Sequence, residues 1–492
     1  MLGAMTRLSL LDLAFFIAES EASPKHVAGL HIHQIPKGGK AGFARQLYEE
    51  FLTHTDVQPP FDQVIHFVSP ALMPSWGAAE SVDLKQHVFF HRLERGTNDR
   101  AALYALAARL HEPVLDRSRP LWEVHVIAGL WDRQFAVYYK MHHAVADGIT
   151  MTRWGVESLR TTPGDPTVTP VWTLAHTRRG DGRSKRLDQA IAGTVWKQLT
   201  ANSKRAVGIG RLTAMLALEA VRLTKNAIAL PFMASGDTPF TGNATPGRQF
   251  ATAAVPMARI DAIRKQSRAT LNHVALTCLD GAMHRYLADE GIALDRPITI
   301  QMPVNLRREG EKGGGNKIGI ILVDLSPPTD DAYVRLRNVG YSLRNVRSMI
   351  DAVAPEAVET YTILTGLLGQ IAGMLKLADV VTPMGNTLVS NVPGPAERLY
   401  LKGAPLLEMH PVSTLPATHL LNITLFSYAG TLHFGLIATD ALPHLGRLAA
   451  YVEEEVAALE EAVGIAASTA PDRPARTRSR PAGQRAAQRG QP

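Results

Sequence analysis

The stretch of sequence that decides the fold is His142-His143-Ala144-Val145-Ala146-Asp147-Gly148. It follows residues 135–141, a run enriched in Phe, Val and Tyr that predicts a β-strand ending at the two histidines. Adjacent residues of an extended chain point to opposite faces, so one histidine can face a channel while the other faces the packed interior. An imidazole near neutral pKa can accept the proton of an alcohol, which makes this strand end a candidate catalytic site.

Other interpretations of the same stretch stay open from the residues alone. Two neighbouring histidines can be ordinary core or surface residues. His143 and Asp147 can also ligate a metal, but neither a His-Glu-x-x-His pattern nor paired cysteines supply further ligands, and we expect no metal. Asp147 can cap the helix predicted over residues 149–159. Gly148 permits a backbone conformation that is closed to other residues.

The chain on both sides of this stretch alternates strand and helix patterns. Strand-like runs at 122–130 and 135–141 flank a turn at 131–133, which predicts a β-hairpin, and residues 101–110 predict a helix. In the second half of the chain, the same patterns predict strands at 250–256, 298–304, 317–325, 387–392, 421–428 and 432–437, and helices at 257–267, 271–287 and 442–462.

The length of 492 residues exceeds one ordinary hydrophobic core and indicates two domains of about 150–250 residues each. We predict an N-terminal α/β domain at 1–165, a largely helical, basic linker at 166–248 and a second α/β domain at 249–465. The composition of residues 466–492, which is rich in Ala, Pro, Arg and Gln, cannot build a core and predicts a disordered tail.

Composition excludes several other classes of protein. A single cysteine, Cys278, excludes an internal disulfide framework. Residues 471–492 hold six arginines and one aspartate, which account for most of the net charge of +7, so the predicted domains are nearly neutral and we expect no nucleic-acid partner. Residues 8–16 predict a first buried segment rather than a signal peptide, because Asp12 interrupts their apolar run. No uninterrupted apolar stretch of about 18 residues predicts a transmembrane helix.

The motif His-His-x-x-x-Asp-Gly is the signature of the CoA-dependent acyltransferase superfamily, which this sequence resembles. Four further blocks, in matching order, resemble the bacterial bifunctional wax ester synthase/diacylglycerol acyltransferase family, and the resemblance runs from near Leu8 to near Glu461. These blocks are His26–Leu30, Pro113–Glu123, Pro303–Arg307 and Ser390–Pro395. One position departs from the family pattern, because the Asn-Asp pair before the long central helix is Asn272-His273 here.

The resemblance implies an α/β fold (an α+β sandwich) of two chloramphenicol-acetyltransferase-like domains, joined by a helical linker, with an active-site channel at their interface. It implies transfer of a long-chain fatty acyl group from acyl-CoA to a diacylglycerol or fatty alcohol, with acyl-CoA as a substrate and no cofactor. His143 is then the general base of a reaction without an acyl-enzyme. The candidate donors to the oxyanion are Asn272, Ser390 and Asn391.

The same resemblance gives the neighbours of His143 supporting roles. Asp147 is expected to hold the turn by pairing with an arginine, and His142 is expected to orient the loop. The candidate arginines, in order of preference, are Arg307, Arg119 and Arg308. Residues 120–122 are equally compatible with a scaffold role and with contact to the substrate.

Substrates of this kind do not dissolve in water, so we expect a cytoplasmic enzyme that associates peripherally with the inner membrane or with lipid droplets. Residues 185–225 are basic and partly amphipathic, as an interfacial segment is, although helices packed on the domains with a solvated basic face give the same pattern. Two alternatives remain: a condensation-type enzyme that takes its acyl group from a carrier protein, and a non-catalytic protein that binds lipid or coats droplets.

Overall fold

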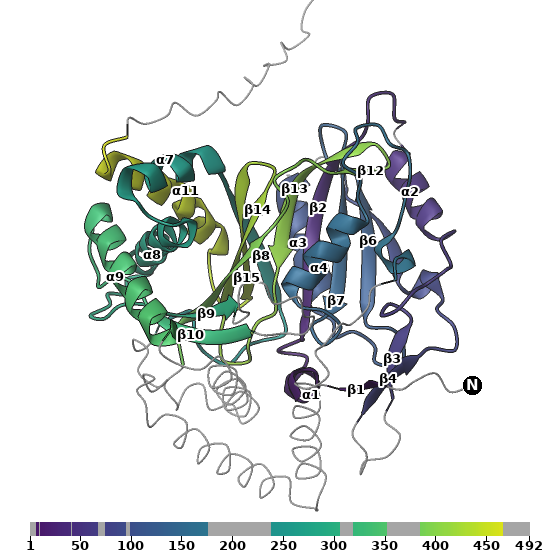
Figure 1. Cartoon of the computed structure of the whole chain (residues 1–492), viewed down its shortest axis with the longest axis horizontal. Helices are drawn as coiled ribbons and strands as arrows, with labels where there is room; N and C mark the ends of the chain where they lie inside the picture. The colour runs from purple at the N-terminus through teal and green to yellow at the C-terminus, as the bar shows by residue number, and fades with distance from the viewer. Residues whose placement is uncertain are drawn as a thin grey trace, which may run out of the picture.

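The computed structural model describes residues 6–8, 10–40, 42–66, 74–94, 99–175, 238–305, 318–351 and 384–465. Most of the predicted linker, the candidates Arg307 and Arg308, and the predicted tail lie outside these residues. The described chain forms two large sheets with helices packed against them, and one small sheet (Figure 1). The small sheet has the order β1 (Thr6–Arg7), β4 (Ser75–Ala78), β3 (Gln63–His66).

The first large sheet contains the predicted hairpin. Its spatial order is β12 (Tyr400–Leu401), β13 (Ala404–Val412), β2 (His26–Gln34), β7 (Gln134–His142), β6 (Trp122–Ala128) and β5 (Val88–Arg92). β6 and β7 pair antiparallel with Trp122 opposite Met141, which confirms the hairpin. β2 pairs antiparallel with β7 and places His26 opposite His142. The start of β2 and the end of β7 therefore lie side by side at the same end of the sheet.

Helices cover both faces of this sheet, and the alternation along β2 explains their placement. Leu30 and Ile32 share a core cluster with Ala107 of α3, whereas His31 lies beside Gly155 of α4. The helices of this half are α1 (Leu10–Ala18), α2 (Phe43–Phe51), α3 (Asp99–His111) and α4 (Gly148–Glu157), with short 3₁₀ helices at Leu84–Gln86 and Val171–Thr173. The helices predicted at 101–110 and 149–159 are therefore confirmed.

The second large sheet contains the strands predicted for the second half. Its order is β10 (Ile318–Asp324), β9 (Thr299–Asn305), β11 (Thr387–Pro393), β14 (Leu421–Tyr428), β15 (Thr431–Thr439) and β8 (Arg248–Pro256). β11 runs parallel to both of its neighbours, and the other pairs are antiparallel. The helices are α7 (Met257–Ser267), α8 (Leu271–Asp289), α9 (Ala332–Asp351) and α11 (Leu445–Ala462). The sequence patterns did not predict α9.

β12 and β13 lie in the second half of the sequence but complete the sheet of the first half. In Figure 1 the green β13 lies beside the purple β2. The two strands pair antiparallel, with Met409 opposite His31. The predicted domain boundaries stay a prediction, but a segment at 249–465 does not keep its strands in one sheet, because residues 400–412 cross to the other. Neither strand was predicted.

Polar contacts reinforce this connection between the halves. Ser23 Oγ donates a hydrogen bond of 2.7 Å to the backbone oxygen of Leu415, and Arg248 Nη2 donates one of 2.7 Å to the backbone oxygen of Ala22. Both contacts involve the segment between α1 and β2. That segment is therefore fixed to the second half just before the end of the sheet at which β2 starts and β7 stops.

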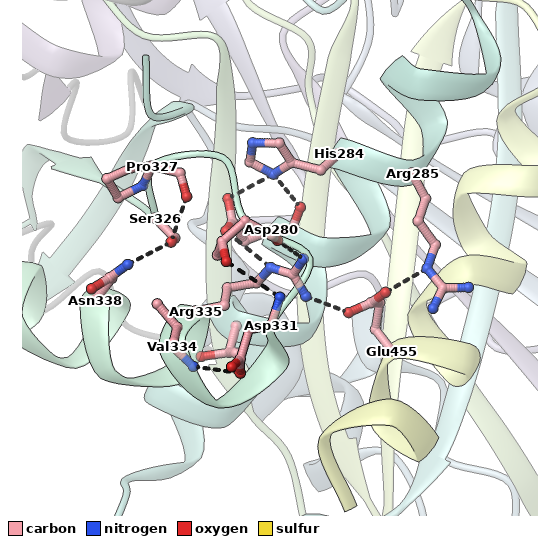
Figure 2. Close-up of polar contacts among 12 residues, drawn as sticks. Asp280, His284, Arg285, Ser326, Pro327, Asp331, Val334, Arg335, Asn338 and Glu455 are labelled. Carbon is pink, nitrogen blue, oxygen red and sulfur yellow. Dashed lines mark hydrogen bonds and ion pairs between the residues drawn. The ribbon is translucent and has the colours of Figure 1, made fainter. Parts of the chain in front are cut away.

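An ionic network joins the helices of the second half: Asp280, Arg335 and Glu455 are buried, and the exposed Arg285 borders them (Figure 2). Arg335 Nη1 of α9 donates to Glu455 Oε2 of α11 at 2.7 Å, and Arg335 Nε lies 3.6 Å from Asp280 Oδ2 of α8. Arg285 Nε contacts the second oxygen of Glu455 at 2.5 Å. Burial raises the pKa of Asp280. A Cβ at Gly281 would lie 2.0 Å from Glu455 Oε2, so the close approach of α11 to α8 requires glycine there.

Candidate active site

The two histidines of the motif lie at the end of β7, beside the start of β2, as the sequence predicts. The backbone N–H of His142 donates to the oxygen of Leu121 at 3.0 Å, and that of His143 donates to the oxygen of Lys25 at 2.7 Å. The backbone of the pair is thus held by the residue that precedes β6 on one side and by the residue that precedes β2 on the other. Ala144, Val145 and Ala146 are buried in the core of the first half, which explains why the positions after the histidines are small and apolar.

The two ring nitrogens of His142 have different neighbours. The backbone N–H of Ala144 donates to Nδ1 at 3.1 Å, so Nδ1 carries no hydrogen and the proton of the neutral ring is on Nε2. Nε2 lies 3.2 Å from Oε1 of Glu19, whose side chain is 1% exposed. Phe16 stacks on the imidazole with the ring centroids 4.6 Å apart. His142 is therefore packed between α1 and the turn, and the orienting role expected of it stays a prediction.

His143 has a different environment. Its side chain is only half-buried, and Phe15 stacks on the ring with a centroid distance of 4.4 Å. Nδ1 is buried and makes no hydrogen bond with the described residues. Burial lowers the pKa of His143, and the carboxylate of Asp147 opposes that effect. Because the pKa falls below the ordinary value of 6.5, the ring is neutral at pH 7 and can accept a proton.

Asp147 caps the helix that follows the turn. Its Oδ1 accepts a 2.7 Å hydrogen bond from the backbone N–H of Thr150, and its backbone is extended, as an N-cap requires. The alternative in which Asp147 caps the helix is therefore confirmed. Gly148 does not use the conformational freedom of glycine: it begins α4 without a positive φ, and a Cβ there would meet Val392 at an ordinary 3.6 Å.

The structure does not support Arg119 as the arginine partner of Asp147. Arg119 lies 3.9 Å from Asp116 and 3.7 Å from Glu123, on the segment that leads into β6. That segment also answers the question about residues 120–122. Leu121 and Trp122 are 1% and 2% exposed, and the indole Nε1 of Trp122 donates to the oxygen of Phe61 at 2.8 Å. Trp122 is thus part of the scaffold, on the strand β6 that pairs with β7.

The second half of the chain contributes the candidate oxyanion donors, Asn272 on α8 and Ser390 and Asn391 on β11. Val392, which faces Gly148, directly follows Asn391 on β11. Asn391 Nδ2 donates to Asn272 Oδ1 at 2.5 Å, which places two of the three candidates in contact. The third, Ser390, exchanges a 2.9 Å hydrogen bond with the hydroxyl of Thr424.

His273, which replaces the aspartate of the family pattern, turns toward another helix. Its Nε2 lies 2.6 Å from the backbone oxygen of Leu336 on α9. A Cβ at Gly340 would lie 2.5 Å from the His273 ring, so the glycine of α9 leaves room for the imidazole. This histidine therefore couples α8 to α9, while the preceding Asn272 keeps its contact with Asn391.

The segment from Phe15 to Lys25 supplies the part of the site that sequence reasoning missed. Phe15 and Phe16 stack on the two histidines, Glu19 contacts one of them, and Lys25 holds the backbone of the other. The apolar run predicted a buried segment, and burial of Leu13 and Phe16 confirms it. The one signal for Glu19 was its place between an apolar helix and the strand at 26–30.

Within the described ranges, no cluster of three or more His, Cys, Asp or Glu side chains is arranged to hold a metal.

Comparison with known families gives two matches that together cover most of the chain. Residues 8–275 match the wax ester synthase/diacylglycerol acyltransferase catalytic domain, and residues 314–460 match the C-terminal domain of the same proteins. A Mycobacterium tuberculosis protein named as a probable diacylglycerol O-acyltransferase is 32% identical over 462 residues, which span 92% of this chain and 98% of that protein.

Solved structures give the same picture. The wax ester synthase/diacylglycerol acyltransferase of Marinobacter aquaeolei VT8 is 28% identical, with a TM-score of 0.76 over 94% of this chain and all of that one. The first condensation domain of the CDA synthetase, at 13% identity and a TM-score of 0.55 over 95% of this chain and 98% of that one, shares the fold alone. The predicted fold of two chloramphenicol-acetyltransferase-like domains is confirmed.

Proposed function

Because the chain belongs to the wax ester synthase/diacylglycerol acyltransferase family, we propose that His143 is the general base with which this acyltransferase moves a fatty acyl group onto a diacylglycerol or alcohol hydroxyl. Acyl transfer itself follows from the family. The role of His143 rests on one observation: its ring is neutral and partly exposed, whereas the ring of the neighbouring His142 is fully buried between the N–H of Ala144 and the carboxylate of Glu19.

The reaction needs one proton acceptor and no covalent enzyme intermediate. Nε2 of His143 removes the proton of the acceptor hydroxyl while the oxygen attacks the thioester carbonyl of acyl-CoA. The tetrahedral intermediate then collapses, the carbon–sulfur bond breaks, and the imidazolium returns the proton to the CoA thiolate. General-base catalysis of this type contributes about 10²–10⁴-fold.

The amide pair of Asn272 and Asn391 supports a site for the oxyanion. Asn391 Nδ2 is engaged with Asn272 Oδ1, which leaves the Nδ2 of Asn272 to donate to a developing negative charge. The hydroxyl of Ser390 is already shared with Thr424, so we rank Ser390 below the pair. Asn272→Ala is expected to lower kcat by about 10²–10³-fold, the loss typical of a missing oxyanion donor.

A thiol-release assay tests the proposal directly. Palmitoyl-CoA is supplied with hexadecanol and, separately, with dipalmitoylglycerol, and the full-length protein is compared with His143→Ala and His142→Asn. We expect release with at least one acceptor and loss of about 10²–10⁴-fold in His143→Ala. Full activity of His143→Ala would refute the role of the base. Activity only with an acyl carrier protein would favour the condensation-type alternative, and no release at all would favour the lipid-binding one.

We also propose that the enzyme reaches its substrates by peripheral association with a membrane or lipid-droplet surface. Among the described residues, no helix is both long and apolar enough to cross a membrane. The implied acceptors partition into lipid, which supports an interfacial encounter. Co-sedimentation of the purified protein with vesicles of phosphatidylglycerol and dipalmitoylglycerol tests this, and recovery of the protein in the supernatant at low salt would contradict it.

A further inference from the structure

We propose that Glu19 is a positioning residue of this acyltransferase, which acts through His142 to fix the loop that carries His143. The inference rests on the proposed function of His143. Glu19 follows the end of α1, and its carboxylate is almost fully buried. Oε1 lies 3.2 Å from Nε2 of His142 and accepts a 3.1 Å hydrogen bond from the backbone N–H of Lys25.

The other oxygen of Glu19 is held by a cation. Arg117 Nη2 donates to Oε2 at 2.9 Å and to the backbone oxygen of Phe16 at 3.1 Å. A buried carboxylate needs such compensation, because leaving it unpaired is costly. Burial works to raise the pKa of Glu19, but these contacts outweigh it and lower the pKa to about 2. The carboxylate is therefore charged at neutral pH.

This geometry connects Glu19 to both histidines at once. Through its side chain it reaches the ring of His142, and through the backbone of Lys25 it fixes the carbonyl that accepts the N–H of His143. The ring of His142 cannot rotate without losing either Glu19 or the N–H of Ala144. The loop is thus held in one conformation before any substrate binds, and such orientation contributes to the rate because small displacements of a reacting group are costly.

The substitution Glu19→Met removes all acceptor oxygens and keeps the length of the side chain. His142→Asn is its partner variant, because an asparagine oxygen can still accept from the N–H of Ala144 while nothing reaches Glu19. The two single variants and the double variant are compared for kcat and KM with palmitoyl-CoA and the preferred acceptor. We expect Glu19→Met to lower kcat by about 10²-fold with little change in KM. In the His142→Asn background, Glu19→Met should add almost nothing.

Glu408 provides a matched control. It also pairs with an arginine and a histidine, Arg100 at 2.6 Å and His410 at 2.8 Å, but on β13 opposite Ile32. That position is six residues along β2 from the strand end at His26, or about 20 Å. Glu408→Met should lower the thermal midpoint and leave kcat unchanged, which separates loss of a carboxylate paired with arginine and histidine from loss of positioning.

Several results would overturn the inference. Wild-type kcat in Glu19→Met, or losses that multiply in the double variant, would show that Glu19 does not act through His142. If Glu19→Met does not fold, Glu19→Asp keeps the charge for Arg117 but shortens the reach to His142, and wild-type kcat in that variant would count equally against us. Full activity of His143→Ala is a different outcome, because it refutes the proposed base whatever Glu19 does.

Discussion

The backbone N–H of Thr150 donates a 2.7 Å hydrogen bond to Oδ1 of Asp147, and the same carboxylate opposes the effect of burial on the pKa of His143. Asp147 therefore has two separable functions. As the N-cap of α4 it needs only an acceptor oxygen, whereas its effect on the pKa of His143 needs a negative charge. Asparagine caps a helix about as well as aspartate but carries no charge, so substitution can distinguish the two.

We predict that Asp147→Asn keeps the stability of the wild type and lowers the pKa of His143, because the carboxylate that raises it is gone. The base must be deprotonated to act, so the acid limb of the profile of kcat/KM against pH moves to lower pH. Asp147→Ala loses the cap as well and should cost about 1 kcal/mol in the free energy of unfolding. An acid limb that stays at the same pH in Asp147→Asn would show that the charge of Asp147 does not affect the pKa of His143.

Lys25 carries a buried ammonium beside the site, and its removal should stabilise the protein. Its Nζ donates to Ser23 Oγ at 2.5 Å, and burial lowers the pKa of Lys25 to about 7, with Glu19 opposing and Arg248 adding to that effect. A folded-state pKa below the unfolded value means that folding is penalised fully below pH 7 and that the penalty fades as the pH rises toward 10.5. Lys25→Met should therefore gain more stability at pH 6 than at pH 9.

The same variant tests the electrostatics of His143. The charge of Lys25 lowers the pKa of His143, so Lys25→Met should move the acid limb to higher pH, opposite in sign to Asp147→Asn. Denaturant unfolding at the two pH values and the pH profile of kcat/KM measure both effects on one preparation. A stability gain that is independent of pH would mean that the ammonium stays charged in the fold over this pH range, as it does in the unfolded chain, so that burial does not lower its pKa.

His273 should prove structural although it occupies a position where the family pattern has a carboxylate. Its contact with the backbone oxygen of Leu336 couples α8 to α9, away from Asn391. His273→Ala is expected to lower the free energy of unfolding by about 1 kcal/mol and to leave kcat unchanged. Asn272→Ala, one residue earlier, should do the reverse. Loss of kcat in His273→Ala would place the imidazole in the catalytic site.

Arg335 is expected to be the most sensitive charged residue of the second half. It stands between two buried carboxylates, Asp280 and Glu455, and Arg335→Met leaves both without their shared cation (Figure 2). Removing one partner of a buried pair costs about 3–5 kcal/mol. The control is Arg45→Met, whose exposed pair with Glu49 should contribute only about 0.3–0.5 kcal/mol. Equal losses in the two variants, measured by urea unfolding, would contradict this account of the network.

Patterns that depend on one segment alone could be predicted from the sequence. The hairpin of β6 and β7, the helix α8 and the helix α11 all follow from local periodicity, and the strand end at His142 and His143 follows from the hairpin. β13 was missed because it contains two prolines, Pro405 and Pro411, and pairs with a strand nearly 380 positions away. A local pattern does not encode that partner.

The candidate site shows the same division. His143 and Asp147 could be assigned because they share one short motif with a chemical rationale. Glu19 could not, since its role depends on a contact across 123 positions of sequence with His142. Arg119 was a wrong choice for a related reason: a nearby arginine fits any acidic partner on paper, and in the fold it meets Asp116 and Glu123 instead.

The crossing of β12 and β13 into the first sheet limits how this chain can be recombined. A hybrid that joins the first 250 residues of this protein to the second half of a relative would pair a foreign β13 with β2. Because β2 in turn pairs with β7, that foreign strand would lie two strands from the hairpin. The pairing of β13 with β2 would then be mismatched beside the catalytic loop, even though every motif residue was retained. Exchanges should therefore move residues 400–412 together with the N-terminal half, and libraries that cut the chain only once should yield few active members.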